Sequence, residues 1–372
     1  MNAFPMPGFR FVTAQAEFEA CCAALVGAPW VALDTEFERS RTFHAELCLV
    51  QIAAPELLVC MDPLALTDLR PLSAALAAAP APKLLHAARQ DLEVLYRIDA
   101  RLPAPLFDTQ VAAGLAGFAD NIGYADLVKQ MLDVVLDKSQ TRTDWRQRPL
   151  TAAQLDYAAA DVLHLEPLAA RLRERLAALG RLAWLAEDCR ALLQPELYRQ
   201  APASAWQRLR GLQGLAREAQ ARAVALAEWR ETVAQGRNLP RGWVLKDDEL
   251  LAIAAAAPAN ARDLARHAPD NGNLRRHGEA ILALLNGILP EPPAATPRLT
   301  AAGRGALKRL SAQAQAIAAE LGIASSLLVT RRELEGLVCG EVSPRLRDGW
   351  RGTVLATLLA ARPDSTDGPL WE

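Results

Sequence analysis

Several features that are common in proteins are missing from this sequence of 372 residues. Apolar residues make up half of it, but they never form the uninterrupted run of roughly 18 to 20 that a membrane-spanning helix needs, so we expect a soluble chain with no membrane partner. The first residues show no basic region followed by an apolar core and a small-residue cleavage site, which predicts a cytoplasmic location. The six cysteines form no CxxC pair and no Cys/His cluster, which argues against a zinc site or a disulfide framework.

The net charge of −2 is the sum of two unlike halves. Residues 1–198 carry 18 Lys/Arg and 25 Asp/Glu, a balance of −7, whereas residues 199–372 carry 23 and 18, a balance of +5. Within the second half, residues 199–246 hold nine basic and three acidic side chains. Such a segment suits a polyanion, because Lys and Arg that neutralise phosphates release counterions. A solvated helix face has the same composition, so the excess alone leaves both interpretations open.

Short apolar runs alternate with helical patterns in the first half of the chain. Strands are predicted at residues 30–38, 46–54, 57–61 and 83–86. Apolar residues at three- and four-residue spacing predict helices at residues 68–79, 89–98, 108–118 and 150–180. Strands mixed with helices in this way indicate an α/β domain, in which helices cover the faces of a sheet.

After about residue 195 the strand signals stop and only helical patterns follow. Two stretches, residues 195–205 and 289–298, have the proline and small-residue content of linkers. These boundaries predict three domains, at residues 1–198, 199–290 and 296–365.

The segment Trp30–Glu38, WVALDTEFE, is an apolar strand that ends in three carboxylates. Alternate side chains of a strand share a face, so Asp34 and Glu36 lie side by side while Thr35 takes the other face. Like charges so placed need either solvent or a cation. A strand that has reached the surface would satisfy the same pattern.

Further acids complete an inventory that suits metal ions. Asp91 lies where a predicted strand gives way to a helix, and Tyr157 and Asp161 lie one turn apart on a later helix. Together with Asp34 and Glu36, these acids could hold two divalent cations about 3.5–4 Å apart. Hard cations such as Mg²⁺ prefer oxygen ligands and keep positions open for water and phosphate.

Three motifs carry a resemblance to a known family. In order and spacing, Asp34-Thr-Glu36, the segment from His86 to Asp91, and the segment from Tyr157 to Asp161 resemble the exonuclease motifs of the DEDD superfamily in its tyrosine-bearing branch, and within it the ribonuclease D family. Segments at residues 206–211, 226–231 and 239–242 resemble the helicase-and-RNase-D C-terminal (HRDC) domain, and residues 333–351 resemble a second, more divergent copy. The resemblance spans about residues 10 to 362.

The resemblance implies a fold and an activity. The fold would be an α/β ribonuclease H-like exonuclease domain, a mixed sheet flanked by helices, followed by two small all-α domains. The activity would be 3′→5′ exoribonuclease trimming of structured RNA such as tRNA precursors by two-metal-ion hydrolysis, with release of nucleoside 5′-monophosphates. The cofactors would be two divalent ions, Mg²⁺ or Mn²⁺, the partner RNA, and the protein a monomer.

The resemblance also implies residue roles. Asp34 would bridge both metals, Glu36 and Asp161 would complete the site of the metal that binds the attacking water, and Asp91 would serve the second metal. Tyr157 would orient the water more than deprotonate it, because a free tyrosine has a pKa near 10.

Neighbouring residues have structural interpretations beside functional ones. His86 is expected to be a hydrogen-bonded structural residue, and Asp108 a helix N-cap. Trp206 and Trp229 are expected in a core. Contacts with substrate are predicted for six residues, although a solvated loop would account for the four basic ones: Phe37, Gln51, Lys138, Arg142, Arg146 and Arg148.

Two other functional classes compete with an exoribonuclease. A DNA 3′→5′ exonuclease would use the same four acids, and a non-catalytic RNA-binding protein would keep the fold as a scaffold. The complete set of four acids and Tyr157 argues against the scaffold. Discrimination of RNA from DNA requires contact with the 2′-OH, and no residue of the sequence is assigned to that contact.

Overall fold

The computed structural model describes residues 9–137, 139–140, 143–267, 272–294, 297–360 and 370–371. The chain folds into two compact units. The described residues of the first unit lie within Met1–Phe37, Leu47–Tyr198 and Pro297–Glu372, and those of the second within Glu38–Glu46 and Arg199–Thr296.

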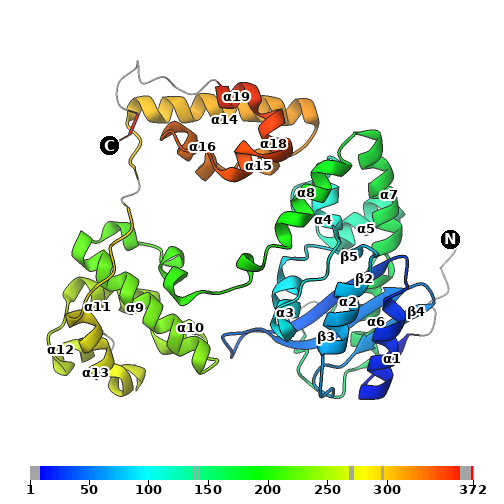
Figure 1. Cartoon of the computed structure of the whole chain (residues 1–372), viewed down its shortest axis with the longest axis horizontal. Helices are drawn as coiled ribbons and strands as arrows, with labels where there is room; N and C mark the ends of the chain where they lie inside the picture. Colours follow the sequence, from blue (N-terminus) through cyan, green and yellow to red (C-terminus); the bar gives the residue numbers. More distant parts are fainter. Residues whose placement is uncertain are drawn as a thin grey trace. The chain divides into compact units, whose positions relative to one another are not determined.

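The first unit is built on a six-stranded mixed sheet flanked by helices (Figure 1). Its strands are β1 (Arg10–Val12), β2 (Val31–Glu38), β3 (Glu46–Ala54), β4 (Leu57–Met61), β5 (Lys83–Leu85) and β6 (Leu106–Asp108). Their order across the sheet is β1-β4-β3-β2-β5-β6. Strand β4 is parallel to β1 and antiparallel to β3, and β5 is parallel to both β2 and β6. Because β2 lies in the middle of this order, it is buried along its apolar first half and carries its acids outward from the core.

Helices pack against this sheet and bury an apolar core. They are α1 (Gln15–Leu25), α2 (Arg70–Ala78), α3 (Arg89–Asp99), α4 (Thr109–Leu115), α5 (Tyr124–Leu132), α6 (Ala152–Leu163), α7 (Leu165–Ala178) and α8 (Leu182–Leu192). Helices α6, α7 and α8 contact β4, β5 and β6 respectively. The predicted α/β architecture is confirmed. The periodicity at residues 150–180 corresponds to two helices, however, because α6 ends and α7 begins at His164.

The carboxy-terminal helices belong to the first unit and pack against α8. They are α14 (Ala301–Leu321), α15 (Ser325–Leu328), α16 (Arg331–Val338), α17 (Pro344–Arg347), α18 (Gly349–Val354) and α19 (Ala356–Ala360), here called the terminal helices. Trp350 stacks on Trp184 with ring centroids 4.3 Å apart, and Arg351 binds the Asp188 carboxylate through two hydrogen bonds of 2.5 and 2.9 Å. The terminal helices and α8 therefore share one apolar and ionic interface.

The second unit is helical and has its own core. Its α-helices are α9 (Arg217–Gly236), α10 (Arg241–Val244), α11 (Asp247–Ala256), α12 (Ala261–Ala265) and α13 (Gly272–Asn286), preceded by short 3₁₀ turns. The unit also contains the segment Glu38–Glu46, in which the buried ring of Phe43 packs against Ala234 and Val244. The Arg241 guanidinium lies over the Phe43 ring, 4.4 Å from its centroid.

Two tryptophans and several basic residues of the second unit take part in its internal packing. Trp206 and Trp229 are partly buried against the core of the unit, as predicted. Three of the nine basic residues of the segment 199–246 form ion pairs with two acids of the same unit. Arg208 and Arg241 bind the fully buried Glu231, and the buried Arg230 binds Asp247.

Candidate active site

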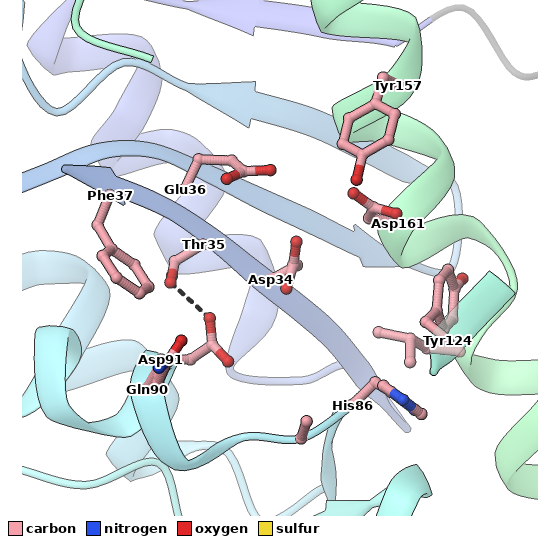
Figure 2. Close-up of a pocket in the computed structure, with 12 residues that line it drawn as sticks. Asp34, Thr35, Glu36, Phe37, His86, Gln90, Asp91, Tyr124, Tyr157 and Asp161 are labelled. Atoms are coloured by element: carbon pink, nitrogen blue, oxygen red, sulfur yellow. Dashed lines mark hydrogen bonds between the residues drawn. The ribbon is translucent and has the colours of Figure 1, made fainter. Parts of the chain in front are cut away.

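A cavity of about 340 Å³ opens beside β2 and brings the predicted acids together (Figure 2). Its lining residues come from β2, the β5–α3 turn, α3, α5, α6 and the start of α7. They are Asp34, Thr35, Glu36, Phe37, His86, Ala87, Gln90, Asp91, Tyr124, Tyr157, Asp161 and Leu165. The four acids and Tyr157, which the sequence places in three separate segments, therefore face one space.

Strand β2 supplies two of the acids and a buried hydroxyl. Asp34, Glu36 and Asp161 each offer a carboxylate oxygen, and these oxygens lie within 4.8 Å of one another. Thr35 is buried, and its hydroxyl donates a 2.5 Å hydrogen bond to the Asp91 carboxylate. The strand thus contributes two carboxylates that could hold a metal ion and orients Asp91 through a side chain.

Asp91 is also placed by the turn that precedes α3. The Asp108 carboxylate accepts the backbone N–H groups of Ala87 and Ala88 at 3.1 and 2.8 Å, and caps α4 as well through Gln110 and Val111. Ala87 has a φ of 57°, a left-handed conformation that an alanine adopts at a cost and that these hydrogen bonds help to maintain. Asp108 is the N-cap that the sequence predicts, and its second set of contacts fixes the start of the helix that carries Asp91.

Helix α6 supplies Tyr157 and Asp161 on one face. A capping box fixes its first turn, in which Thr151 and Gln154 exchange side-chain-to-backbone hydrogen bonds. Tyr157 and Asp161 are four residues apart, so their side chains lie beside each other (Figure 2). A hydrogen bond from the Tyr157 hydroxyl lowers the pKa of the Asp161 carboxyl, against the larger effect of burial. The ring of Trp145 lies 6.2 Å from that of Tyr157.

The electrostatics of the cavity favour a cation. Burial raises the pKa of Asp34 well above its ordinary value, and the charges of Asp91, Asp161 and Glu36 raise it further. Burial also raises the pKa of Glu36 to about 8, and that of Asp91 and of Asp161 to about 7. Among the described residues that line the cavity there is no Lys or Arg to offset this charge. Clustered carboxylate oxygens without a protein counter-ion suit a hard divalent metal ion.

The substrate residues predicted from the sequence occupy different places. Phe37 lines the cavity. Gln51 is fully buried on β3 and does not line it, and its amide nitrogen and oxygen have no hydrogen-bond partner among the described residues. Arg146 is exposed, so its contact with substrate, like those of Phe37 and Gln51, stays a prediction. Lys138 and Arg142 lie outside the described residues.

Arg148 has a structural environment. Its guanidinium binds the buried Asp62 carboxylate through two hydrogen bonds of 2.6 Å, and it also donates to the Cys48 and Trp145 carbonyls. These contacts hold the loop before α6 against β3 and β4. They account for the guanidinium without a substrate, so the predicted substrate contact of Arg148 has no support from this arrangement.

Three other residues that line the cavity are His86, Tyr124 and Thr35. The ring nitrogens of His86 lie 2.9 Å from the Thr109 hydroxyl and 3.0 Å from the Ile122 carbonyl, so His86 is the hydrogen-bonded structural residue that was predicted. The Tyr124 hydroxyl donates to the Ala160 carbonyl at 3.1 Å, next to Asp161. Thr35 could have been noticed because it separates two acids in the sequence. No pattern in the sequence marks Tyr124.

Known families match both parts of the chain. A model described as 3'-5' exonuclease matches residues 9–177, and an HRDC domain model matches residues 219–285. Ribonuclease D of Gluconacetobacter diazotrophicus is 39% identical over 384 aligned positions, which cover 97% of this chain and 94% of that relative. Ribonuclease D of Escherichia coli strain K12 is 34% identical, over 94% of this chain and 97% of that relative.

A solved structure agrees with these matches over the whole fold. The crystal structure of Escherichia coli RNase D, described as an exoribonuclease involved in structured RNA processing, matches with a TM-score of 0.88 at 32% identity, over 97% of this chain and 100% of that one. The sheet, its flanking helices and the acids around one cavity define a 3′→5′ exonuclease. The chain belongs to the ribonuclease D family, whose members are exoribonucleases, and hydrolyses RNA from its 3′ end.

No helix among the described residues combines the length and the apolar character that crossing a membrane requires.

Proposed function

We propose that this exoribonuclease trims the 3′ ends of structured RNA such as tRNA precursors, and that it does so with two divalent metal ions. The relative from Escherichia coli is described as acting in structured RNA processing. The basic excess of residues 199–246 supports a long or folded RNA, because an acidic catalytic half attracts phosphates poorly away from its metal site.

The observation that carries the two-metal proposal is the central position of Asp34. It shares a cluster with Glu36 and Asp161, and its pKa also responds to the charge of Asp91, the fourth acid of the cavity. An acid so placed can serve two cation positions, one beside Glu36 and Asp161 and one toward Asp91. Mg²⁺ or Mn²⁺ ions held there would activate a water and offset the charge that develops on the leaving 3′ oxygen.

The residues of the cavity then have distinct roles in the proposal. Asp34, Glu36, Asp91 and Asp161 hold the metals. Thr35 keeps the Asp91 carboxylate in one orientation. The Tyr157 hydroxyl, beside Asp161, orients the attacking water. Because the bond between phosphorus and the 3′ oxygen would break, the phosphate would stay on the 5′ oxygen of the last nucleoside. The product would be a nucleoside 5′-monophosphate.

Replacement of Asp34 tests this assignment. We expect Asp34→Asn to reduce RNA degradation to the level of buffer, because a neutral amide cannot serve two cations, while the melting temperature stays the same or rises. Asp156→Asn is a matched control, since Asp156 lies on the exposed side of the same α6 helix and does not line the cavity. If folded Asp34→Asn protein degrades RNA at the parental rate, the metal-site assignment is wrong.

A comparison of substrates tests the RNA that is proposed. The enzyme should shorten the 3′ extension of a tRNA precursor one nucleotide at a time, release nucleoside 5′-monophosphates, and stop when EDTA removes the metals. Release of nucleoside 3′-monophosphates would contradict the proposed chemistry, and failure on the precursor with full activity on unstructured RNA would contradict the proposed substrate.

A further inference from the structure

A hollow of about 450 Å³ lies on the second unit, far along the sequence from the catalytic acids. Its walls come from α10, the start of α11 and the first turns of α13. We call it the tryptophan hollow, and the side chains that line it include Trp243, Lys246, Glu249, Asn273 and Arg276. All of them belong to the unit that contains the HRDC match.

The exposure of Trp243 follows from its place on a short helix. Arg241 and Val244, three residues apart, occupy the inner face of α10, where Arg241 binds Glu231 and Val244 is buried. Trp243 cannot share that face, and the residue is 55% exposed. A single exposed apolar residue is ordinary on a protein surface. The side chains around it distinguish this one.

The hollow is held by hydrogen bonds between its walls. The Asn273 side-chain amide donates to the Trp243 carbonyl at 2.6 Å, and its oxygen accepts from the Arg237 guanidinium at 3.1 Å. Helix α13 is thus tied to the backbone that carries the indole. A rigid aromatic face loses little conformational freedom when a ligand stacks on it.

Cations flank the indole. Lys246 and Arg276 are exposed and line the same hollow, and Arg237 stands behind Asn273. Glu249 is the acid of the hollow, and its carboxylate accepts the backbone N–H of Lys246 at 2.9 Å at the start of α11. The hollow therefore presents one flat π face with two cations and one acid, and a third cation, Arg237, lies behind it.

A flat aromatic face beside cations matches single-stranded nucleic acid, in which an unstacked base lies against the ring and phosphates approach the charges. We propose that the tryptophan hollow binds an unpaired stretch of the RNA substrate, with one base stacked on Trp243 and neighbouring phosphates at Lys246 and Arg276. The inference rests on the proposed function, because it assigns a binding position for the same RNA.

Binding of a labelled single-stranded 12-nucleotide RNA to the full chain, with EDTA present to prevent cleavage, tests the proposal. Trp243→Ala should weaken binding roughly 5- to 150-fold, the range for loss of one base–aromatic stack, and Trp243→Phe should restore most of it. Lys246→Gln and Arg276→Gln should each reduce the slope of log affinity against log salt by about 0.7, whereas Trp243→Ala should leave the slope unchanged.

Two further probes separate stacking from other causes. An abasic strand of the same length offers phosphates without bases, so Trp243→Ala should not weaken its binding. A blunt RNA duplex hides its base faces and should be equally insensitive. Ile288→Ala removes an apolar side chain that is fully exposed, and Arg266→Gln removes an exposed cation at the end of α12 that is paired with Asp263. Both variants should bind the strand like the parent.

The outcomes distinguish this inference from the proposed function. Unchanged binding by folded Trp243→Ala, or an equal loss for the RNA and the abasic strand, would overturn the tryptophan hollow as a base-binding site. The Trp243→Ala enzyme should still hydrolyse a trinucleotide with parental kcat. Retained hydrolysis by Asp34→Asn would instead overturn the metal-site proposal, whatever the binding data show.

Discussion

The Thr35 hydroxyl donates a 2.5 Å hydrogen bond to the Asp91 carboxylate across 56 residues of sequence. Both side chains are buried, so no bulk water can replace the donor if it is lost. The strand that carries two of the acids thereby fixes the orientation of a third.

Removal of that hydroxyl should weaken metal use without unfolding the domain. We expect Thr35→Val to lower kcat and to raise the Mg²⁺ concentration for half-maximal activity, one or both by roughly 10- to 100-fold, as is typical when a partner of a metal ligand is lost. Valine has a similar shape and suits a strand, so the fold should persist. Thr35→Ser keeps a hydroxyl and should recover much of the activity. Parental kinetics for Thr35→Val across a Mg²⁺ titration would show that Asp91 needs no such support.

Tyr157→Phe should lower turnover far more than RNA affinity. The phenyl ring keeps the packing near Trp145 while the hydroxyl beside Asp161 is lost. An interaction that acts in the transition state changes kcat and leaves substrate binding nearly constant. Single-turnover kinetics and equilibrium binding in EDTA separate the two quantities. Tyr124→Phe is the matched control, because that hydroxyl is bonded to the Ala160 carbonyl and not to an acid of the site. A large loss of affinity with normal turnover would make Tyr157 a substrate-binding residue.

The interface between α8 and the terminal helices should contribute to the stability of the first unit. In Arg351→Met, the largely buried Asp188 would lose both hydrogen bonds of its ion pair. The free energy of unfolding, measured in urea, should therefore fall by roughly 3 kcal/mol. Arg331→Met removes an exposed pair with Glu335 on α16 and should cost about 0.5 kcal/mol or less. Equal stability of the two variants would mean that the interface contributes little.

This interface also determines which variants can test the proposed binding of RNA by the second unit. A chain truncated after residue 198 would lose the terminal helices as well as the basic second unit, and would uncover Trp184. Reduced RNA binding by such a truncation could then come from damage to the first unit. Point variants of the second unit, such as those in the tryptophan hollow, avoid this ambiguity.

Lys83 should make stability depend on alkaline pH. Its side chain is buried on β5, its ammonium donates to the Ala79 and Ala104 carbonyls, and burial lowers its pKa to about 8. Between pH 8 and 10.5 the unfolded chain therefore binds more protons at this site than the folded chain, so the free energy of unfolding rises with pH. The contribution from this residue should grow by about 2 kcal/mol from pH 8 to pH 10.

The measurement is urea unfolding of the parent and of Lys83→Met at both pH values. Other titrating groups are common to the two proteins, so the stability of the parent relative to the variant isolates Lys83. A difference that stays constant between pH 8 and pH 10 would show that the folded-state pKa of Lys83 is ordinary.

The sequence by itself determined the class of fold and the chemistry of the site. Apolar runs located β2 to β5 within one residue, because buried strands of five or more residues and turn-bounded short runs leave a local signal. The sequence also supplied the spacing of Asp34, Glu36, Asp91, Tyr157 and Asp161, on which the resemblance to ribonuclease D depended. Membership of that family is confirmed. Strands β1 and β6, of three residues each, were not predicted.

Only the tertiary structure decided which side chains meet. The bond from Thr35 to Asp91 joins residues far apart in the chain, as do the ion pairs of Arg148 with Asp62 and of Arg351 with Asp188. Local patterns carry the preferences of a residue for helix, strand and burial, but the partner of a buried charge is fixed by which elements pack together. For the same reason, Arg148 is predicted from the sequence as a cation of a loop and is an ion-paired anchor in the fold. Trp243 faces solvent because Arg241 and Val244 occupy the inner side of its helix, a relationship that the sequence analysis did not predict.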